Sequence, residues 1–302
     1  MATRDYTLDQ PVLDTLEQAL REPPLSGRAA PSSVFRPSTH DEVSAVLSAA
    51  DRFGGRVGVG TSPVEGVIVL DLTGLAAIRE VDGTSQLVTA GAGCTPRAIA
   101  ASASASGLEL DLGYFAEPDA PLGDALARGE AAPLVFSVRA ALPDGAVFET
   151  PRAPRRASGP APEALLVGGD HRAGIVVEAT LRLREVDPSA RWVSLPGGAG
   201  RLRLLARSGV RWRSAALTAE GEARALLAAS DVPADAVASE APALPTRGRP
   251  VFRRWSTLTA PAGPLDLHGG WVRGGHAGPA APWLEKARAA IDPRRTLAGG
   301  AP

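Results

Sequence analysis

The residues of this sequence that are best suited to binding a ligand lie in three glycine-containing turns. The first turn, residues 58–62, links two short apolar runs. Glycine lets a ligand approach the main chain, successive N–H groups can form an anion nest, and two hydroxyls add donors. The turn lacks the lysine of a P-loop and leads into a strand, which argues against a nucleotide triphosphatase and a dinucleotide fingerprint. A phosphate site and an ordinary loop both remain open. Its residues are Gly58, Val59, Gly60, Thr61 and Ser62.

The second turn, residues 91–96, follows a strand and opens a helix. Gly91 and Gly93, with Asp111 twenty positions after Gly91, imitate a dinucleotide-binding turn. Pro96, however, occupies the position where close packing of helix and strand requires a small residue, and a hairpin precedes the turn. An NAD-dependent enzyme using these glycines is therefore only a distant alternative. The neighbouring Cys94 is predicted to be a small buried residue.

The third turn, residues 167–175, has a glycine pair, a polar tip and a glycine entering a strand. It could place backbone amides against a planar ligand, or it could be a simple tight turn. The four histidines are scattered without metal-ligand spacing, so no metal site is predicted. His276 lies in a Gly-Gly-His-Ala turn, where an exposed imidazole could act as a base or be merely solvated.

The length and composition limit the number of domains and the classes of function. With 302 residues, the chain can form one large domain or two ordinary ones. A net charge of -1 argues against a nucleic-acid binder, and a single cysteine excludes a disulfide framework. No apolar run reaches about 18 residues and no signal core opens the chain. We therefore expect a cytoplasmic protein without a membrane span.

The elements that position the turns form an α+β pattern. Thr39 and Glu42 predict a capped helix that begins near His40 and ends at Gly54. Asp82-Gly83 predicts a hairpin, and Thr95-Pro96 opens a second helix. Further patterns predict a loop at 116–133, an alternating strand from 177 to 184, and helices at 219–229 and 283–291.

The order of these pieces resembles FAD-binding oxidoreductases of the p-cresol methylhydroxylase/vanillyl-alcohol oxidase type. Within that type it looks most like the FAD-binding E subunit of bacterial glycolate oxidase. Leu122-Gly123-Asp124 stands where the family has Ile-Gly-Gly, and His171 stands where the third turn of the family has its second glycine. Other segments that carry the resemblance are 36–43, 58–62, 88–93, 167–181, 274–277 and 291–300.

The resemblance implies two α+β lobes that sandwich an extended FAD, and a small, shortened cap domain over the flavin. It implies that the first turn holds the pyrophosphate and that two other segments line the adenine and flavin path. Those segments are Pro121, Leu122 and Gly123, and Gly174, Ile175 and Val176. His276 is the catalytic candidate. The implied parts are an N-terminal helix and linker (1–30), the FAD-binding domain (31–186), the cap (187–270) and a returning C-terminal segment (271–302).

The sequence also departs from the family. The segment after Gly123 is short, and the asparagine, tyrosine and aspartate that the family carries at the positions of 155–161 are missing. The resemblance implies an FAD-dependent oxidoreductase, or subunit of one, that passes electrons from a small 2-hydroxy acid through flavin to a partner oxidoreductase subunit. The departures favour an alternative, in which the same fold without flavin serves as a scaffold or partner subunit.

Overall fold

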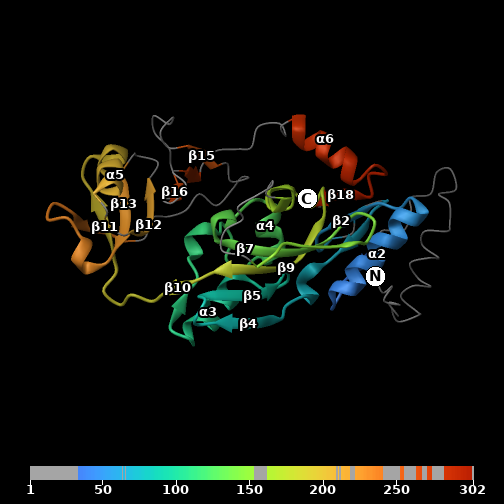
Figure 1. Ribbon diagram of the computed structural model, residues 1–302, viewed down its shortest axis with the longest axis horizontal. Coiled ribbons are helices and arrows are strands. Elements are labelled where there is room, and N and C mark those ends of the chain that lie inside the picture. The colour runs from blue at the N-terminus through green and yellow to red at the C-terminus, as the bar shows by residue number, and fades with distance from the viewer. Residues whose placement is uncertain are drawn as a thin grey trace.

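Two sheets pack together as lobes, and a third sheet lies at one end of the long axis of the molecule (Figure 1). The computed structural model describes residues 33–62, 64, 66–152, 162–208, 210, 212–217, 222–240, 252–254, 263–266, 271–273 and 282–300. The mixture of sheets and helices confirms the predicted α+β class. None of the helices in these ranges has both the length and the apolar composition to cross a membrane.

The first lobe is a parallel sheet with the strand order β1-β3-β2-β18. Its strands are β1 (Ser33–Phe35), β3 (Ile68–Leu70), β2 (Val57–Val59) and β18 (Leu297–Gly300).

Helix α2 (His40–Phe53) packs on this lobe and begins and ends as predicted. The Thr39 hydroxyl accepts from the Glu42 N–H, and the Glu42 carboxylate accepts from the Ser38 N–H, which satisfies two donors at the helix start. Gly54 ends the helix with φ +74°, a conformation that glycine adopts without steric cost.

The C-terminal segment returns to the first lobe. Helix α6 (Pro282–Ile291) matches the predicted helix and leads to β18, which pairs in parallel with β2. The Asp292 carboxylate accepts hydrogen bonds from the N–H groups of Thr296 and Leu297 and fixes the turn between them. Residues from the two ends of the chain therefore share one sheet.

The second lobe is an antiparallel sheet with the order β4-β5-β9-β7-β8. The predicted hairpin at Asp82-Gly83 joins its first two strands, and the alternating strand lies at its centre. Helix α3 (Pro96–Ser104) starts at the predicted Thr95 cap. The strands are β4 (Ile78–Asp82), β5 (Leu87–Gly91), β9 (Ile175–Arg182), β7 (Val135–Ala141) and β8 (Val147–Glu149).

One expectation for this lobe is wrong. Residues 116–133 are not a loop throughout, because they contain helix α4 (Leu122–Ala127). Leu122, Ala125 and Leu126 are fully buried in the core of the second lobe. Because every residue of the helix except Asp124 is buried, tertiary packing stabilises a helix too short to be recognised by its period. Two short strands, β6 (Leu108–Glu109) and β10 (Arg184–Glu185), pair beside this core.

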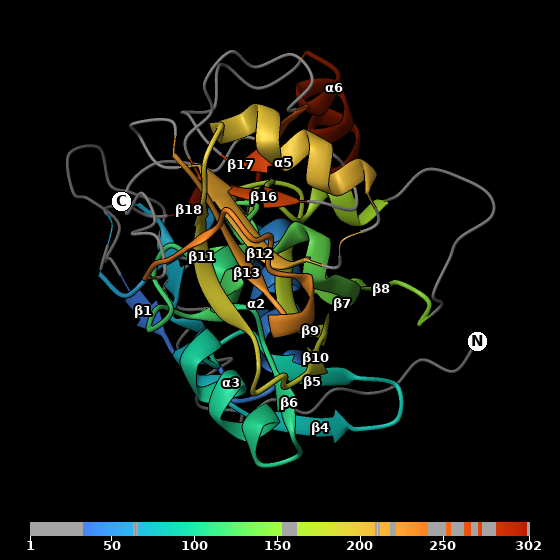
Figure 2. The ribbon, with the colours of Figure 1, turned by 90° about the vertical axis from the view of Figure 1, so that its left-hand side faces the viewer.

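The third sheet has seven strands in the order β14-β11-β13-β12-β16-β17-β15, and α5 (Gly198–Arg207) covers one face of it (Figure 2). The helix expected at 219–229 is wrong, because β13 (Ala223–Leu227) lies there. Its residues alternate between buried and half-buried, and it pairs with strands on both sides. Helix-favouring alanine and leucine are thus overridden by the tertiary pairing. The other strands are β11 (Arg191–Leu195), β12 (Trp212–Leu217), β14 (Val237–Ala238), β15 (Phe252–Arg254), β16 (Gly263–Asp266) and β17 (Trp271–Arg273).

Candidate functional site

The three candidate segments meet at the junction of the two lobes. One hydrophobic cluster contains Val57 and Val59 of β2, Ala92 at the end of β5, and Ile175 of β9. A side chain at Gly123 would touch Ala92, so α4 reaches the same junction. The fold therefore gathers the first turn, the start of α4 and the start of β9 around one core, although they lie far apart in the sequence.

The first turn carries two exposed polar residues shortly after β2. Gly58 and Val59 lie within β2, and the Gly60 N–H donates to the Leu70 carbonyl oxygen at 3.0 Å. These residues therefore extend the sheet. Thr61 and Ser62 follow, and both are exposed. Donors for a phosphate at this turn would come from these last two residues.

The second turn uses its amides within the protein. A Cβ atom on Gly93 would overlap the Leu72 carbonyl oxygen, so the glycine is required by a close approach of two backbones. Because the N–H groups of residues 91–94 already have partners, they form no nest for a pyrophosphate, which argues against the NAD alternative. The bonds run from Gly91 to Ala77 O (2.9 Å), Ala92 to Val177 O (2.9 Å), Gly93 to Leu75 O (3.1 Å) and Cys94 to Gly91 O (3.0 Å).

Cys94 is buried, as predicted. Burial raises the pKa of its thiol, because a thiolate would lose its hydration. The residue is therefore a small apolar side chain in the core, and its reactivity at neutral pH is low.

The start of α4 is tied to the second turn. Pro121 precedes the helix, the Leu122 N–H donates to the Cys94 carbonyl oxygen, and the Gly123 N–H donates to the Ala92 carbonyl oxygen, both at 2.8 Å. A Cβ atom on Gly123 would lie 3.0 Å from the Ala92 Cβ atom. The packing of α4 on the sheet is thus sufficient to explain this glycine.

The third turn is hydrogen-bonded to the C-terminal end of α4. Gly168 has φ +86°, and its N–H donates to the Leu126 carbonyl oxygen at 2.8 Å. A Cβ atom on Gly174 would lie 2.8 Å from Leu166 Cδ2, so packing explains this glycine too. The side chains of Ile175 and Val176 are buried in the core. Only their main chain could face a ligand.

The structure pairs two polar residues at this contact that the sequence reasoning did not join. His171 is buried, and its Nε2 atom lies 3.6 Å from Asp124 Oδ1 on α4. Among the described residues, no group forms a hydrogen bond with this Nε2 atom. The signal in the sequence was that both residues stand at positions where the resembled family has glycine.

The predicted catalytic residue, His276, lies outside the described residues, so its position stays a prediction. Within the described ranges, no group of three or more metal-binding side chains comes together, and the structure offers no metal centre there.

A polar cluster joins α2 to the second lobe. His40 Nε2 lies 3.9 Å from Glu178 Oε2, and the Arg79 guanidinium forms an ion pair with the same carboxylate. Burial lowers the pKa of His40, which the Glu178 carboxylate partly opposes and the charge of Arg139 reinforces. The cluster lies between the lobes and contains none of the predicted site residues.

A cavity of about 600 Å³ lies on the second lobe, and it does not coincide with the three turns. Its charged groups are already paired. Arg152 lies 3.5 Å from Glu80, and the Arg182 guanidinium lies over the Phe136 ring and donates to the Val135 carbonyl oxygen. The lining residues are Glu80, Asp82, Ser85, Leu87, Thr89, Phe136, Arg152, Thr180 and Arg182.

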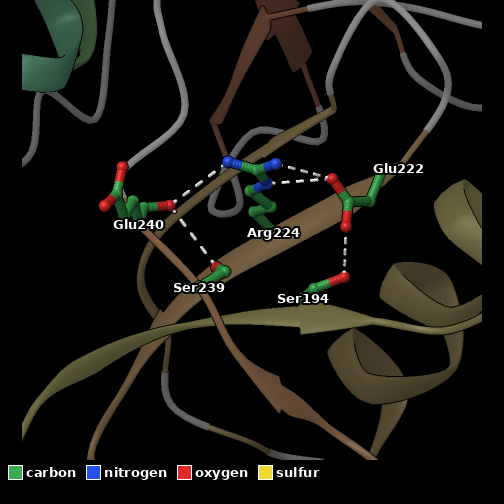
Figure 3. Close-up of polar contacts among 5 residues, drawn as sticks. All are labelled: Ser194, Glu222, Arg224, Ser239 and Glu240. Carbon is green, nitrogen blue, oxygen red and sulfur yellow. Dashed lines mark hydrogen bonds and ion pairs between the residues drawn. The ribbon is translucent and has the colours of Figure 1, made fainter.

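A compact polar network fixes part of the third sheet (Figure 3). Glu222 accepts from the Ser194 hydroxyl and from Arg224 Nε and Nη2, and these contacts lower the pKa of its carboxyl group. Arg224 also donates to the Glu240 carbonyl oxygen, as the Ser239 hydroxyl does. The bonds link neighbouring strands to the segment after β14, which is a structural role.

Comparisons with known proteins support the expected cofactor and fold. Residues 31–150 match the family described as FAD binding domain, which indicates FAD binding by this region. The match includes the first turn and the whole of α4, and it ends just after β8. No curated protein matches the sequence.

Solved structures of alkyldihydroxyacetonephosphate synthase are similar to this chain, and the first of them, together with the match to the FAD binding domain, shows the FAD-binding fold of the p-cresol methylhydroxylase type. One, in the crystal form P212121, has a TM-score of 0.50 and 17% identity over 61% of this chain. Another, in P1, has a TM-score of 0.48 and 16% identity over 61% of this chain. The matches span 38% and 39% of the synthase chains, less than two fifths of their length.

Proposed function

We propose, from the premise that residues 31–150 form an FAD binding domain, that this chain is an FAD-dependent oxidoreductase or the FAD-carrying subunit of one. The observation that carries the proposal is the junction of the lobes. There the strand that leads into the exposed Thr61 and Ser62 and the first residue of β9 share one hydrophobic cluster, and Gly123 of α4 packs against Ala92 of that cluster. Thr61, Ser62 and the start of α4 lie within the region that matches the FAD binding domain, whereas the turn of residues 167–175 follows that region in the sequence.

The residues present fit the cofactor. The hydroxyls of Thr61 and Ser62 are exposed donors suited to a pyrophosphate that needs no lysine. The unpartnered Nε2 atom of His171 is a buried polar group for which a cofactor would supply a partner. When bound, FAD supplies the redox chemistry, and the protein supplies its position and its electrostatic surroundings. Leu122, Ile175 and Val176 exclude water from the core beneath it.

The proposed electron donor is a small 2-hydroxy acid, as in the glycolate-oxidase-like proteins that the sequence resembles. His276 would take the proton of the substrate hydroxyl, and the electrons would leave through a partner oxidoreductase subunit. The assignments of the substrate, the base and the partner are supported by the segments 274–277 and 291–300, which resemble motifs of the glycolate oxidase E subunit.

The absorption spectrum of the purified chain tests cofactor binding. We expect a yellow protein with flavin bands, or a colourless apoprotein that binds added FAD in isothermal titration calorimetry. Anaerobic addition of glycolate or lactate should bleach the bands, and His276→Ala should slow the bleaching without removing FAD. A chain that neither carries FAD nor takes it up would overturn the proposal.

The second candidate is a scaffold or partner subunit that keeps the fold without flavin. One observation in its favour is that Asp124 and His171 stand at positions where the resembled family has glycine. The other is that the amides of Gly91, Gly93 and Gly123 already have partners within the protein. This candidate predicts a stable complex with neighbouring gene products that forms equally with and without added FAD. Full flavin occupancy in a protein that captures no partner would contradict it.

A further inference from the structure

A buried histidine faces an aspartate across the contact between α4 and the turn of residues 167–174. The His171 side chain is 4% exposed, and its Nε2 atom lies 3.6 Å from Asp124 Oδ1. That distance is too long for a hydrogen bond, and within the described residues no other group bonds to Nε2. A buried nitrogen that has given up its bonds to water without gaining others requires an explanation.

The backbone of the same turn is held in a conformation that favours glycine. Asp170 and His171 both have φ +56°. The turn is fixed there by bonds from the N–H groups of Gly168 and Asp170 to the carbonyl oxygens of Leu126 and Ala127 in α4. Backbone strain and an unsatisfied ring nitrogen therefore fall on one residue, a coincidence that is typical of binding sites.

We propose that His171 and Asp124 together bind the polar edge of a heterocycle of FAD, an inference that rests on the proposed function. A carboxylate only accepts hydrogen bonds, and a proton on Nε2 beside it makes the imidazole a donor. The pair thus presents one donor next to one acceptor, 3.6 Å apart. An adenine ring and the pyrimidine ring of a flavin each carry a donor next to an acceptor on one edge.

The charges of the pair favour such an edge over the diphosphate. A phosphate placed within reach of His171 Nε2 would also approach the Asp124 carboxylate and be repelled by it. The Asp124 side chain is 33% exposed, so a ligand can approach the pair from the side of the carboxylate. We therefore assign the diphosphate to Thr61 and Ser62 and the heterocycle edge to Asp124 and His171.

Calorimetry on the full apoprotein with three probes tests the assignment. The probes are FAD, ADP and riboflavin, which separate the adenine source of the edge from the flavin source. His171→Phe keeps a planar ring without nitrogen, and Asp124→Ala removes the acceptor. We expect each variant to weaken FAD binding about tenfold, the effect of one lost hydrogen bond. The same loss should appear with ADP or with riboflavin, and not with both.

Two further variants make the result interpretable. His40→Gln removes the imidazole of another buried histidine, at the lobe interface, and should leave all three affinities unchanged. If His171→Phe fails to fold, His171→Asn replaces it, because asparagine tolerates a positive φ. Thermal unfolding of each variant shows that it is folded before the titrations are compared.

Each outcome decides between defined alternatives. If FAD binds to the wild type and to both variants equally, the pair does not contact the cofactor, and this inference fails while the proposed function stands. Equal weakening of ADP and riboflavin would mean a general loss of structure and would also overturn it. If the wild type binds none of the three probes, the proposed function fails, and the inference fails with it.

Discussion

Single residues at the junction show how much of a glycine motif is packing. Gly91, Gly93 and Gly123 each sit where a Cβ atom would press on the neighbouring backbone or side chains, and their amides are bonded within the protein. The second turn resembles a nucleotide motif because its glycines permit close packing against residues 72–75. The polar groups left for a ligand are Thr61 and Ser62 and the pair of Asp124 and His171.

Gly93→Ala should therefore destabilise the fold whether or not a cofactor is present. The added methyl group would overlap the Leu72 carbonyl oxygen, and relief requires a backbone shift that costs about 2–3 kcal/mol. Chemical denaturation of the apoprotein measures the free energy of unfolding. Gly83→Ala is the matched control, because open space surrounds that position and little change is expected. Equal stability of the two variants would contradict the packing explanation.

Among helices and strands, local capping and turn residues account for the parts that form as predicted. Helix α2 is defined by the hydroxyl of Thr39 and the carboxylate of Glu42 at its start and by Gly54 at its end. Helix α4 and strand β13 depend on neighbours instead. The first gains its stability from buried leucines, and the second from pairing on both edges.

Thr39→Ala tests the cap of α2. The variant loses the side-chain acceptor for the Glu42 N–H, which should lower the free energy of unfolding by about 1 kcal/mol. Thr84→Ala, in the exposed hairpin turn, is the control, since only the backbone N–H of Thr84 is bonded to Asp82. The comparison is made by urea denaturation, and a loss of the same size in both variants would count against the cap.

At the scale of the whole molecule, distant segments close the first lobe and join it to the second. Strand β18 near the C-terminus pairs with β2, and Leu297 is buried in the cluster that contains the site junction. The polar cluster of His40, Arg79 and Glu178 lies between α2 and the second lobe. Of these two connections, the pairing of β18 bears on the position of the candidate FAD site, because Leu297 shares a cluster with Val59 and Ile175.

Leu297→Ala should leave a cavity at the junction. The expected loss is about 2–5 kcal/mol in the free energy of unfolding, because the surrounding strands relax only in part. It should also weaken FAD binding, because the junction beneath the first turn loosens. Leu204→Ala on α5 is the control, since that leucine is 60% exposed. Unchanged stability of Leu297→Ala would show that β18 contributes little to the lobe.

The stability of the lobe interface should depend on pH through His40. Its pKa in the folded protein lies below the ordinary value of 6.5, so the unfolded chain binds more protons as the pH falls below that value. The free energy of unfolding should therefore decrease as the pH falls from about 6.5 toward the folded pKa. In His40→Gln this decrease should be smaller between pH 7.5 and 5.5. Identical pH profiles for the two proteins would exclude the contribution of His40.

Local sequence patterns specify the features that arise from neighbouring residues. The capped helix at His40, the hairpin at Asp82-Gly83, the helix at Pro96 and the α+β class all follow from short patterns, and each is confirmed. Tertiary structure alone decided which glycines serve packing, that 223–227 is a strand, and that Asp124 meets His171. These three features depend on contacts between residues far apart in the chain. A local sequence pattern does not predict such contacts.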